Sequence, residues 1–211
     1  ASTDFNGVFY NSKFSQVTIG ESVTSIGDYA FYDCSSLSAI AISEGVTSIG
    51  NKAFYGCSSL ISITIPESVI SIGSDAFSGC TALQSVSLQG SGSTIESGAF
   101  SGCSGLQHII LGASVEKIAD SFDGFTSLIS VEIYTNTQLC TFKDCTSLST
   151  VVIGGQMTEV EPFSFYGCSA LSSVVIQAPI DEIGEYAFAY CSSLTLFKIP
   201  DEVKKINSGA F

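Results

Sequence analysis

The sequence of 211 residues lacks arginine and holds only seven lysines against 20 acidic residues, which gives a formal net charge of -13. Binding to nucleic acids requires Lys and Arg to displace counterions from phosphates, and anionic membrane surfaces attract the same side chains. We therefore expect neither kind of partner. The acidity is better explained as a way to keep an apolar chain soluble and apart from its copies.

Long apolar runs are also missing. No stretch reaches 18 consecutive apolar residues, so we expect no membrane insertion. Residues Ala1 to Tyr10 lack the basic region and the following apolar run of a signal peptide, as a mature secreted chain also would. The last residue, Phe211, falls in the middle of a repeat, which indicates a piece of a longer array.

Residues for catalysis or metal binding are scarce. His108 is the only histidine, and the sequence contains no C-x-x-C pair, no G-x-S-x-G and no phosphate-binding loop. Zinc sites need close Cys/His pairs, and calcium loops need alternating oxygen ligands around a central glycine. We therefore expect no enzyme, no metal site and no cofactor.

What the sequence does contain is a period. Phenylalanines of one column follow each other after 23, 23, 23, 22, 20, 23, 23 and 23 residues. This column consists of Phe31, Phe54, Phe77, Phe100, Phe122, Phe142, Phe165, Phe188 and Phe211. A cysteine follows three residues later at Cys34, Cys57, Cys80, Cys103, Cys145, Cys168 and Cys191. Phe125 takes the remaining place. A fixed period of this length is typical of a solenoid.

Each repeat predicts two extended segments and a turn. In the first segment Ile63 and Ile65 alternate with polar residues, which indicates a strand with one buried face. The same pattern recurs in every repeat, up to Phe197 and Ile199. A corner follows, then an apolar pair three residues apart and a compact turn with Ala-Phe. We expect a β-rich solenoid of about nine 23-residue repeats, coiled to the right, with a parallel sheet on one face.

The repeats resemble a known family. The segments IPESVISIGSDAFSGCTALQSVSL and CSSLSAIAISEGVTSIGNKAFYGCSSL are similar to BspA-like leucine-rich repeats, and the resemblance covers residues 14–211. It implies a leucine-rich-repeat solenoid over residues 1–211 as a single domain, without catalytic residues. We expect residues 1–13 to form a degenerate first turn, with Val8 in place of the phenylalanine and Asn11 in place of the cysteine. The resemblance also implies a cell-surface or secreted location and adhesion as the function.

The cysteines are expected to be structural. Seven occupy one position of the repeat, where the resemblance implies a buried column whose side chains donate to backbone carbonyls. Neighbours in such a column face the same way, and disulfide geometry is demanding, so we expect free thiols. Cys140 lies outside the column, five residues before Cys145. Both an unpaired Cys140 and a Cys140–Cys145 disulfide stay open.

The repeat breaks between residues 112 and 145. The step from Ile133 to Phe142 is nine residues, and the segment from Tyr134 to Leu139 replaces the usual corner and second strand. Such a contraction is either tolerated drift within the array or a reshaped surface that a partner recognises.

Two columns of strand residues are expected to point outward. They are small and uniform in the first four repeats and become varied and more apolar from His108 onward. The candidate binding face consists of His108, Ile110, Glu132, Tyr134, Val152 and Val175. Exposed apolar clusters often mark interaction sites, although β-branched residues are also ordinary on strands.

Two functions agree with this sequence. The first is an adhesin-like module, a monomer, that binds a host or microbial surface protein or glycan through the outward face. The second is a structural spacer without a ligand of its own, which the uniform first repeats favour.

Overall fold

The computed structural model describes residues 8–89, 93–113, 115–119, 122–135 and 140–211. Every regular element in these ranges is a β-strand, and the strands build a parallel β-solenoid of about eight turns. The chain divides into two compact units. Unit 1 comprises Ala1–Leu106 and Ser114–Asp120, and unit 2 comprises Gln107–Ala113 and Ser121–Phe211. The predicted fold class is confirmed.

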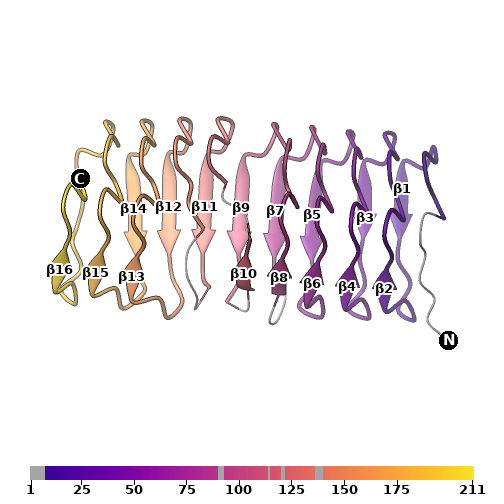
Figure 1. Cartoon of the computed structure of the whole chain (residues 1–211), viewed down its shortest axis with the longest axis horizontal. Coiled ribbons are helices and arrows are strands. Elements are labelled where there is room, and N and C mark those ends of the chain that lie inside the picture. Colours follow the sequence, from indigo (N-terminus) through magenta and orange to yellow (C-terminus); the bar gives the residue numbers. More distant parts are fainter. Residues whose placement is uncertain (1–7, 90–92, 114, 120–121, 136–139) are drawn as a thin grey trace. The chain divides into compact units, whose positions relative to one another are not determined.

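Unit 1 contains two kinds of strand, which alternate along the chain (Figure 1). In the first kind, β1 pairs with β3 and β5 pairs with β7, always in parallel and one repeat apart. In the second kind, each strand pairs with the equivalent strand of the next coil. The first kind comprises β1 (Gln16–Thr18), β3 (Ala39–Ala41), β5 (Ser62–Ile65) and β7 (Ser85–Leu88). The second comprises β2 (Ser25–Ile26), β4 (Ser48–Ile49), β6 (Ser71–Ile72), β8 (Ser93–Ile95) and β10 (Val115–Ile118).

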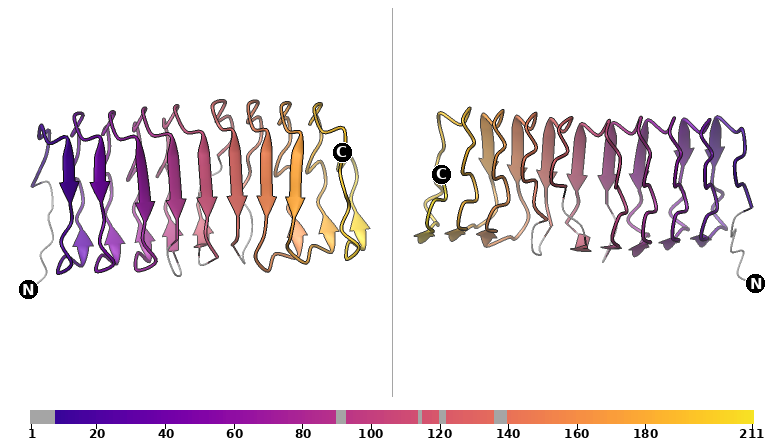
Figure 2. Two further views of the ribbon diagram at one scale, coloured as in Figure 1. Left: turned by 180° about the vertical axis from the view of Figure 1, so that it is seen from behind. Right: turned by 45° about the horizontal axis from the view of Figure 1, so that its top comes forward.

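Unit 2 repeats this arrangement, and Figure 2 shows its longer strands side by side and pointing the same way. The longer strands are β9 (His108–Leu111), β11 (Ser130–Ile133), β12 (Thr150–Ile153) and β14 (Ser173–Ile176). The shorter ones are β13 (Glu159–Val160), β15 (Glu182–Ile183) and β16 (Lys205–Ile206). The expected second extended segment is therefore a narrow parallel sheet in each unit.

The phenylalanine column forms the core of each unit. In unit 1 the rings of Phe31, Phe54 and Phe77 stack with centroids 5.1 Å apart and planes within 4° of parallel. In unit 2 Phe142 stacks on Phe165 with centroids 5.8 Å apart. These distances are close to the spacing of paired strands, about 4.8 Å, because equivalent residues of successive coils lie one above the other. The period in the sequence therefore becomes a column of buried rings.

The cysteine column lies beside the rings and closes the turns. Each thiol donates to the carbonyl of the phenylalanine in the preceding coil, as Cys57 Sγ does to Phe31 O at 3.2 Å and Cys168 Sγ to Phe142 O at 3.1 Å. Burial raises the pKa of Cys57 to about 12 and that of Cys191 to about 11. Such thiols are poor nucleophiles, since the thiolate is the reactive form.

Cys140 is buried as well, and all eight cysteines are unbridged. Of the two alternatives for Cys140, the structure has the unpaired thiol and not the disulfide with Cys145. The contracted coil around it is only partly described, because residues 136–139 of the segment from Tyr134 to Leu139 lie outside the described residues.

The first turn departs from the register that we expected. Phe9, and not Val8, stacks on Phe31, with ring centroids 5.1 Å apart. Its carbonyl accepts the thiol of Cys34 at 2.9 Å, as the phenylalanine carbonyls do in later coils. The expectation for Val8 was wrong, because the first step is one residue shorter than the period. Asn11 correspondingly lies one residue before the position of the cysteine.

The last repeat also differs from the expectation. No strand forms in the described residues around Phe197 and Ile199, although the alternation predicted one. Leu196 on this segment is 83% exposed. The alternating pattern alone does not make a strand, because a strand also needs backbone partners along its length.

Candidate functional site

The longer strands of unit 2 bring most of the predicted face into one row. Paired in register, Ile110 lies beside Glu132, Glu132 beside Val152, and Val152 beside Val175. The alternating residues on the other side of the same strands, such as Val131 and Val151, are buried in the core. The row is therefore fixed by core packing, and its own residues do not take part in that packing.

This row is mainly apolar and accessible. Ile110 is 36% exposed and Val175 is 43% exposed, while Val152 is half-buried between its neighbours. Side chains at directly opposed strand positions lie about 5 Å apart, so these three apolar residues and Glu132 form a continuous surface. The strands β9, β11, β12 and β14 carry no lysine, which leaves Glu132 as their only charged side chain.

A second row borders the first and is polar. It contains His108, Ser130, Thr150 and Ser173, one from each strand in register. His108 Nδ1 and Ser130 Oγ are 2.7 Å apart and share a hydrogen bond. An apolar centre with a polar border is the usual composition of an interaction surface.

Tyr134 follows β11 directly and completes the face. Its hydroxyl donates to Glu132 Oε2 at 3.0 Å, and this hydrogen bond is the main reason why the pKa of Tyr134 is raised. The carboxylate of Glu132 is thereby held in place and keeps one oxygen for a donor on a partner. All six residues of the candidate face thus belong to unit 2.

Gly154 makes room for the ring of Tyr134. The sequence pattern indicated only that this glycine forms a corner, and not that it faces Tyr134. It occupies the place of Tyr134 in the next coil, and a Cβ at Gly154 would fall 2.5 Å from Tyr134 Cδ1. The next residue, Gly155, has a φ of 72°, a conformation that favours glycine. The ring of Tyr134 therefore lies over a backbone that has no side chain to displace it.

The corresponding row of unit 1 is different in chemistry. Its members in the same column are Thr18, Ala41, Thr64 and Ser87. Ala41 and Thr64 are exposed, as Ile110 and Val175 are in unit 2. Unit 1 thus presents small side chains where unit 2 presents Ile110, Glu132 and Val152.

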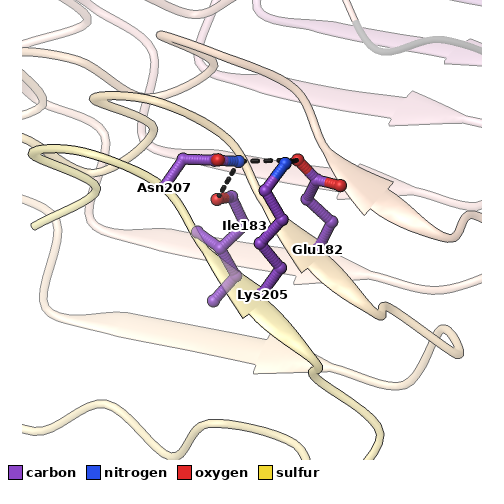
Figure 3. A network of polar contacts seen from close by, with 4 residues as sticks. All are labelled: Glu182, Ile183, Lys205 and Asn207. Carbon is purple, nitrogen blue, oxygen red and sulfur yellow. Dashed lines mark hydrogen bonds and ion pairs between the residues drawn. The ribbon is translucent and has the colours of Figure 1, made fainter.

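The short strands of unit 2 carry a charged cluster (Figure 3). Glu182 Oε1 accepts hydrogen bonds from Lys205 Nζ and Asn207 Nδ2, both at 2.7 Å, and Asn207 Nδ2 also donates to Ile183 O at 3.1 Å. The bond from Lys205 is the main cause of the lowered pKa of Glu182, and the same bond raises the pKa of Lys205. These side chains join two successive coils.

Glu159 stands on the other side of Glu182 in this cluster, opposite it in the β13–β15 pairing. Partial burial raises the pKa of Glu159, and the nearby Glu161 and Glu182 raise it further. Among the described residues no group of three or more His, Cys, Asp or Glu side chains lies close enough to hold a metal ion. In the same ranges no helix has the length and the apolar character that crossing a membrane requires.

Solved structures of bacterial leucine-rich repeat proteins share this fold. A leucine-rich repeat protein of Eubacterium ventriosum is 21% identical, with a TM-score of 0.62 over 94% of this chain and 82% of the other. The pneumococcal vaccine antigen PcpA is 20% identical, with a TM-score of 0.51 over 90% of this chain and 51% of the antigen. No curated protein matches the sequence.

The amino-acid sequence itself also matches a known family of repeats. The BspA type leucine-rich repeat region matches residues 5–128 and 119–211, in six copies. The two matches together cover nearly the whole chain, including the residues of the candidate face. This chain belongs to the family of BspA type leucine-rich repeat proteins.

Proposed function

We propose that this chain is a non-enzymatic, adhesin-like interaction module that binds a surface protein through the longer strands of unit 2. The binding face consists of His108, Ile110, Glu132, Tyr134, Val152 and Val175. The observation that carries the proposal is the row from Ile110 to Val175, in which exposed apolar residues surround one oriented carboxylate.

The chemistry of the row favours a protein partner. Apolar side chains of a partner fit Ile110, Val152 and Val175, and removal of this surface from water contributes the binding energy. Glu132 adds a requirement for a donor or a cation opposite it, which gives specificity. We place the chain on the cell surface or among secreted proteins, as the family resemblance implies.

The alternative is a structural spacer without a ligand. The uniform row of unit 1, with Ala41, Thr64 and Ser87, supports it, because small side chains offer little area for a partner. Both functions are compatible if unit 2 binds and unit 1 only extends the array. The choice depends on whether the row of unit 2 retains a ligand.

The test compares two matched double variants on a panel of purified extracellular-matrix proteins and a glycan array. Ile110→Asp with Val152→Asp introduces two charges into the row of unit 2. Ala41→Asp with Ser87→Asp introduces the same charges at the same column of unit 1. We expect the wild type and the unit 1 variant to retain a matrix protein, and the unit 2 variant to bind it at least about tenfold more weakly.

Three other results would change the proposal. If no protein or glycan is retained by the wild type, the spacer function gains. If both variants lose the ligand equally, binding depends on net charge and not on the row. If only a glycan is retained, and is lost with the unit 2 variant, the site stands but the partner class is wrong. Circular dichroism on both variants establishes that they are folded.

A further inference from the structure

The turns of unit 2 carry a second exposed surface, away from the residues proposed above. Four aromatic rings from two successive coils meet there. Phe163 stacks on Tyr186 with centroids 5.3 Å apart, Phe163 contacts Tyr166 at 5.9 Å, and Tyr190 meets Tyr166 edge-on at 5.0 Å. We call the residues Phe163, Tyr166, Tyr186 and Tyr190 the aromatic turn patch. Three of them belong to the large exposed apolar residues of the chain.

Tyr190 is the most unusual member of the aromatic turn patch. It is 71% exposed, and its φ of 60° lies in the left-handed region that bulky residues rarely adopt. The other described coils place only Asn, Asp or Gly at the same step after the core phenylalanine, all with positive φ. These residues are Asn11, Asp33, Gly56, Gly79, Gly102, Gly124, Asp144 and Gly167. Neither the backbone nor the core therefore accounts for a tyrosine at this position.

Phe163 and Tyr186 lie at a second position of the turn, two residues before the core phenylalanine. Their φ angles are 59° and 53°, and the turn has a positive φ here in other coils as well, as Tyr29, Lys52, Asp75, Gly98 and Gly209 show. Both rings remain exposed, at 40% and 36%. The strained residue that is peculiar to this patch is therefore Tyr190, and strain of that kind is often found at ligand-binding positions.

Unit 1 also has tyrosines in its turns, and three of their rings cover one another. Tyr10 and Tyr32 stack with planes 6° apart, and Tyr32 and Tyr55 with planes 7° apart, at centroid distances of 5.4 Å and 4.9 Å. In the aromatic turn patch the planes of Tyr166 and Tyr190 differ by 69°, and those of Phe163 and Tyr166 by 50°. Tyr29 of unit 1 is tilted by 43° against Tyr32, much as Phe163 is against Tyr166. The edge-on pair of Tyr166 and Tyr190 therefore distinguishes the patch, because it leaves the faces of an exposed ring uncovered.

The patch lies beside a negative charge. Desolvation is the main cause of the raised pKa of Tyr166, and the carboxylate of Asp144 is close enough to contribute to it. The chain as a whole has a formal net charge of -13. One cation of the chain already uses a ring of the patch, since Lys143 Nζ lies 5.1 Å from the centroid of Tyr166. Lys52 Nζ lies similarly 5.7 Å from the centroid of Tyr55 in unit 1, so tyrosines at this position of the turn accept an ammonium group.

We propose that the aromatic turn patch binds arginine or lysine side chains of a basic segment on a partner protein. The guanidinium of arginine is planar and weakly hydrated, so it stacks on exposed rings and is also attracted by the carboxylate of Asp144. Tyr190 supplies the most accessible ring, and Tyr166 with Asp144 beside it supplies the second contact. This site is distinct from the apolar row of unit 2, which requires a partner of different composition.

The experiment uses fluorescent peptides and measures their anisotropy with the whole chain. The probe is a peptide of alternating Arg and Gly, and the matched peptide replaces each Arg by citrulline, which has the same shape without the charge. Tyr166→Ser with Tyr190→Gly removes two rings of the patch and restores residues that other coils have at these positions. Tyr32→Ser with Tyr55→Ser removes two rings from unit 1 and is the control.

We expect the Arg peptide to bind the wild type and the unit 1 control equally, and the patch variant about tenfold more weakly. The citrulline peptide should bind all three weakly. The Ile110→Asp, Val152→Asp variant should retain the Arg peptide, so that failure of the strand face and failure of the patch are distinguishable. Circular dichroism and thermal unfolding show whether the patch variant has kept its fold.

Several results would overturn the proposal. Equal affinity of the Arg peptide for the wild type and the patch variant would mean that net negative charge alone attracts it. Equal affinity of the Arg and citrulline peptides would remove the role of the cation. On a glycan array, a sugar that binds the wild type and is lost with the patch variant, while the Arg peptide does not bind, would assign the surface to carbohydrate instead.

Discussion

The two units have the same core and different outer faces. In unit 1, Ile63 and Val86 face inward from neighbouring strands, as Val131 and Val151 do in unit 2, and all four are buried. On the outer side the two units diverge, with small side chains in unit 1 and the apolar row around Glu132 in unit 2. The solenoid therefore requires only the inner residues, and the outer ones are free to differ.

The short strands show the same contrast. In unit 1 the paired strands place Ser25, Ser48, Ser71, Thr94 and Lys117 in one column. In unit 2 the corresponding column holds Glu159, Glu182 and Lys205. Charged side chains are thus more frequent in the column of unit 2, although the backbone pairing is alike. A repeat fold allows this, because each coil needs only the contacts with its neighbours.

The largest expected loss of stability follows from changes in the phenylalanine column, which both units share. Phe77→Ala in unit 1 and Phe142→Ala in unit 2 each remove a fully buried ring from the stacked column. Each variant should lower the free energy of unfolding by about 3–5 kcal/mol, because the lost burial is accompanied by a cavity. Urea denaturation followed by circular dichroism measures the change.

Ile61→Ala and Ile129→Ala are the matched controls for these variants. Both residues follow the buried leucine of their coil and are exposed, at 50% and 39%. Their substitution should change the free energy of unfolding by no more than about 0.5 kcal/mol. If Phe77→Ala and Ile61→Ala had similar effects, the phenylalanine column would not be the common core that the comparison assumes.

Most of the fold was predictable, because the residues that recur with the period are those that face the core. The core phenylalanines recur at steps of 20 to 23 residues, mostly followed by a cysteine three residues later, and stacking of equivalent residues follows from the solenoid. The prediction failed at the ends of the pattern. Phe9 stands one residue off the period, and only its ring contact with Phe31 shows that it continues the column. Around Phe197 the alternation is intact, yet the strand is missing.

The candidate sites were less predictable, since outer positions have no periodic constraint. The alternation indicated that Ile110, Val152 and Val175 point outward, and the pairing now places them beside Glu132. The hydrogen bond of Tyr134 and the space left by Gly154 depend on contacts between coils, which no local pattern reveals. The aromatic turn patch was missed for another reason: Tyr190 replaces a turn residue, and its significance lies in its φ angle and exposure.

A smaller loss of stability is expected from a change on the strand face, where the side chains of unit 2 differ from those of unit 1. Tyr134→Phe removes the hydroxyl that donates to Glu132 and leaves the ring over Gly154. The free energy of unfolding should fall by about 0.5–1 kcal/mol, the lower range for a hydrogen bond, because the pair is partly exposed. Denaturation in urea measures this loss.

Tyr29→Phe serves as the control in unit 1, since Tyr29 is exposed, its ring contacts Tyr32, and its hydroxyl has no hydrogen bond to another described residue. The free energy of unfolding of the Tyr29→Phe variant should equal that of the wild type. Glu132→Gln should also lower the raised pKa of Tyr134 towards its ordinary value, which a spectrophotometric titration of the phenol detects. An unchanged titration would show that Tyr134 and Glu132 are not joined in solution, and the face would then lack its oriented carboxylate.

The smallest effect should come from the charged column of unit 2, tested with Lys205→Met. Because Lys205 lowers the pKa of Glu182, the pair stabilises the folded state above the ordinary pKa of glutamate, about 4.3. This contribution is lost as the pH falls through the lowered pKa of Glu182. Because Glu182 raises the pKa of Lys205, the stabilisation is present below about 10.4 and is lost as the pH rises through the raised value. The variant should therefore melt at a lower temperature than the wild type mainly between about pH 5 and 10.

Lys198→Met is the control, because Lys198 is exposed and forms no ion pair with any described residue. It removes the same charge from the same unit without breaking a contact between coils. The difference in melting temperature between the two variants should shrink in about 1 M salt, where exposed charges are screened. A difference that is independent of both pH and salt would assign the effect of Lys205 to the packing of its aliphatic stem.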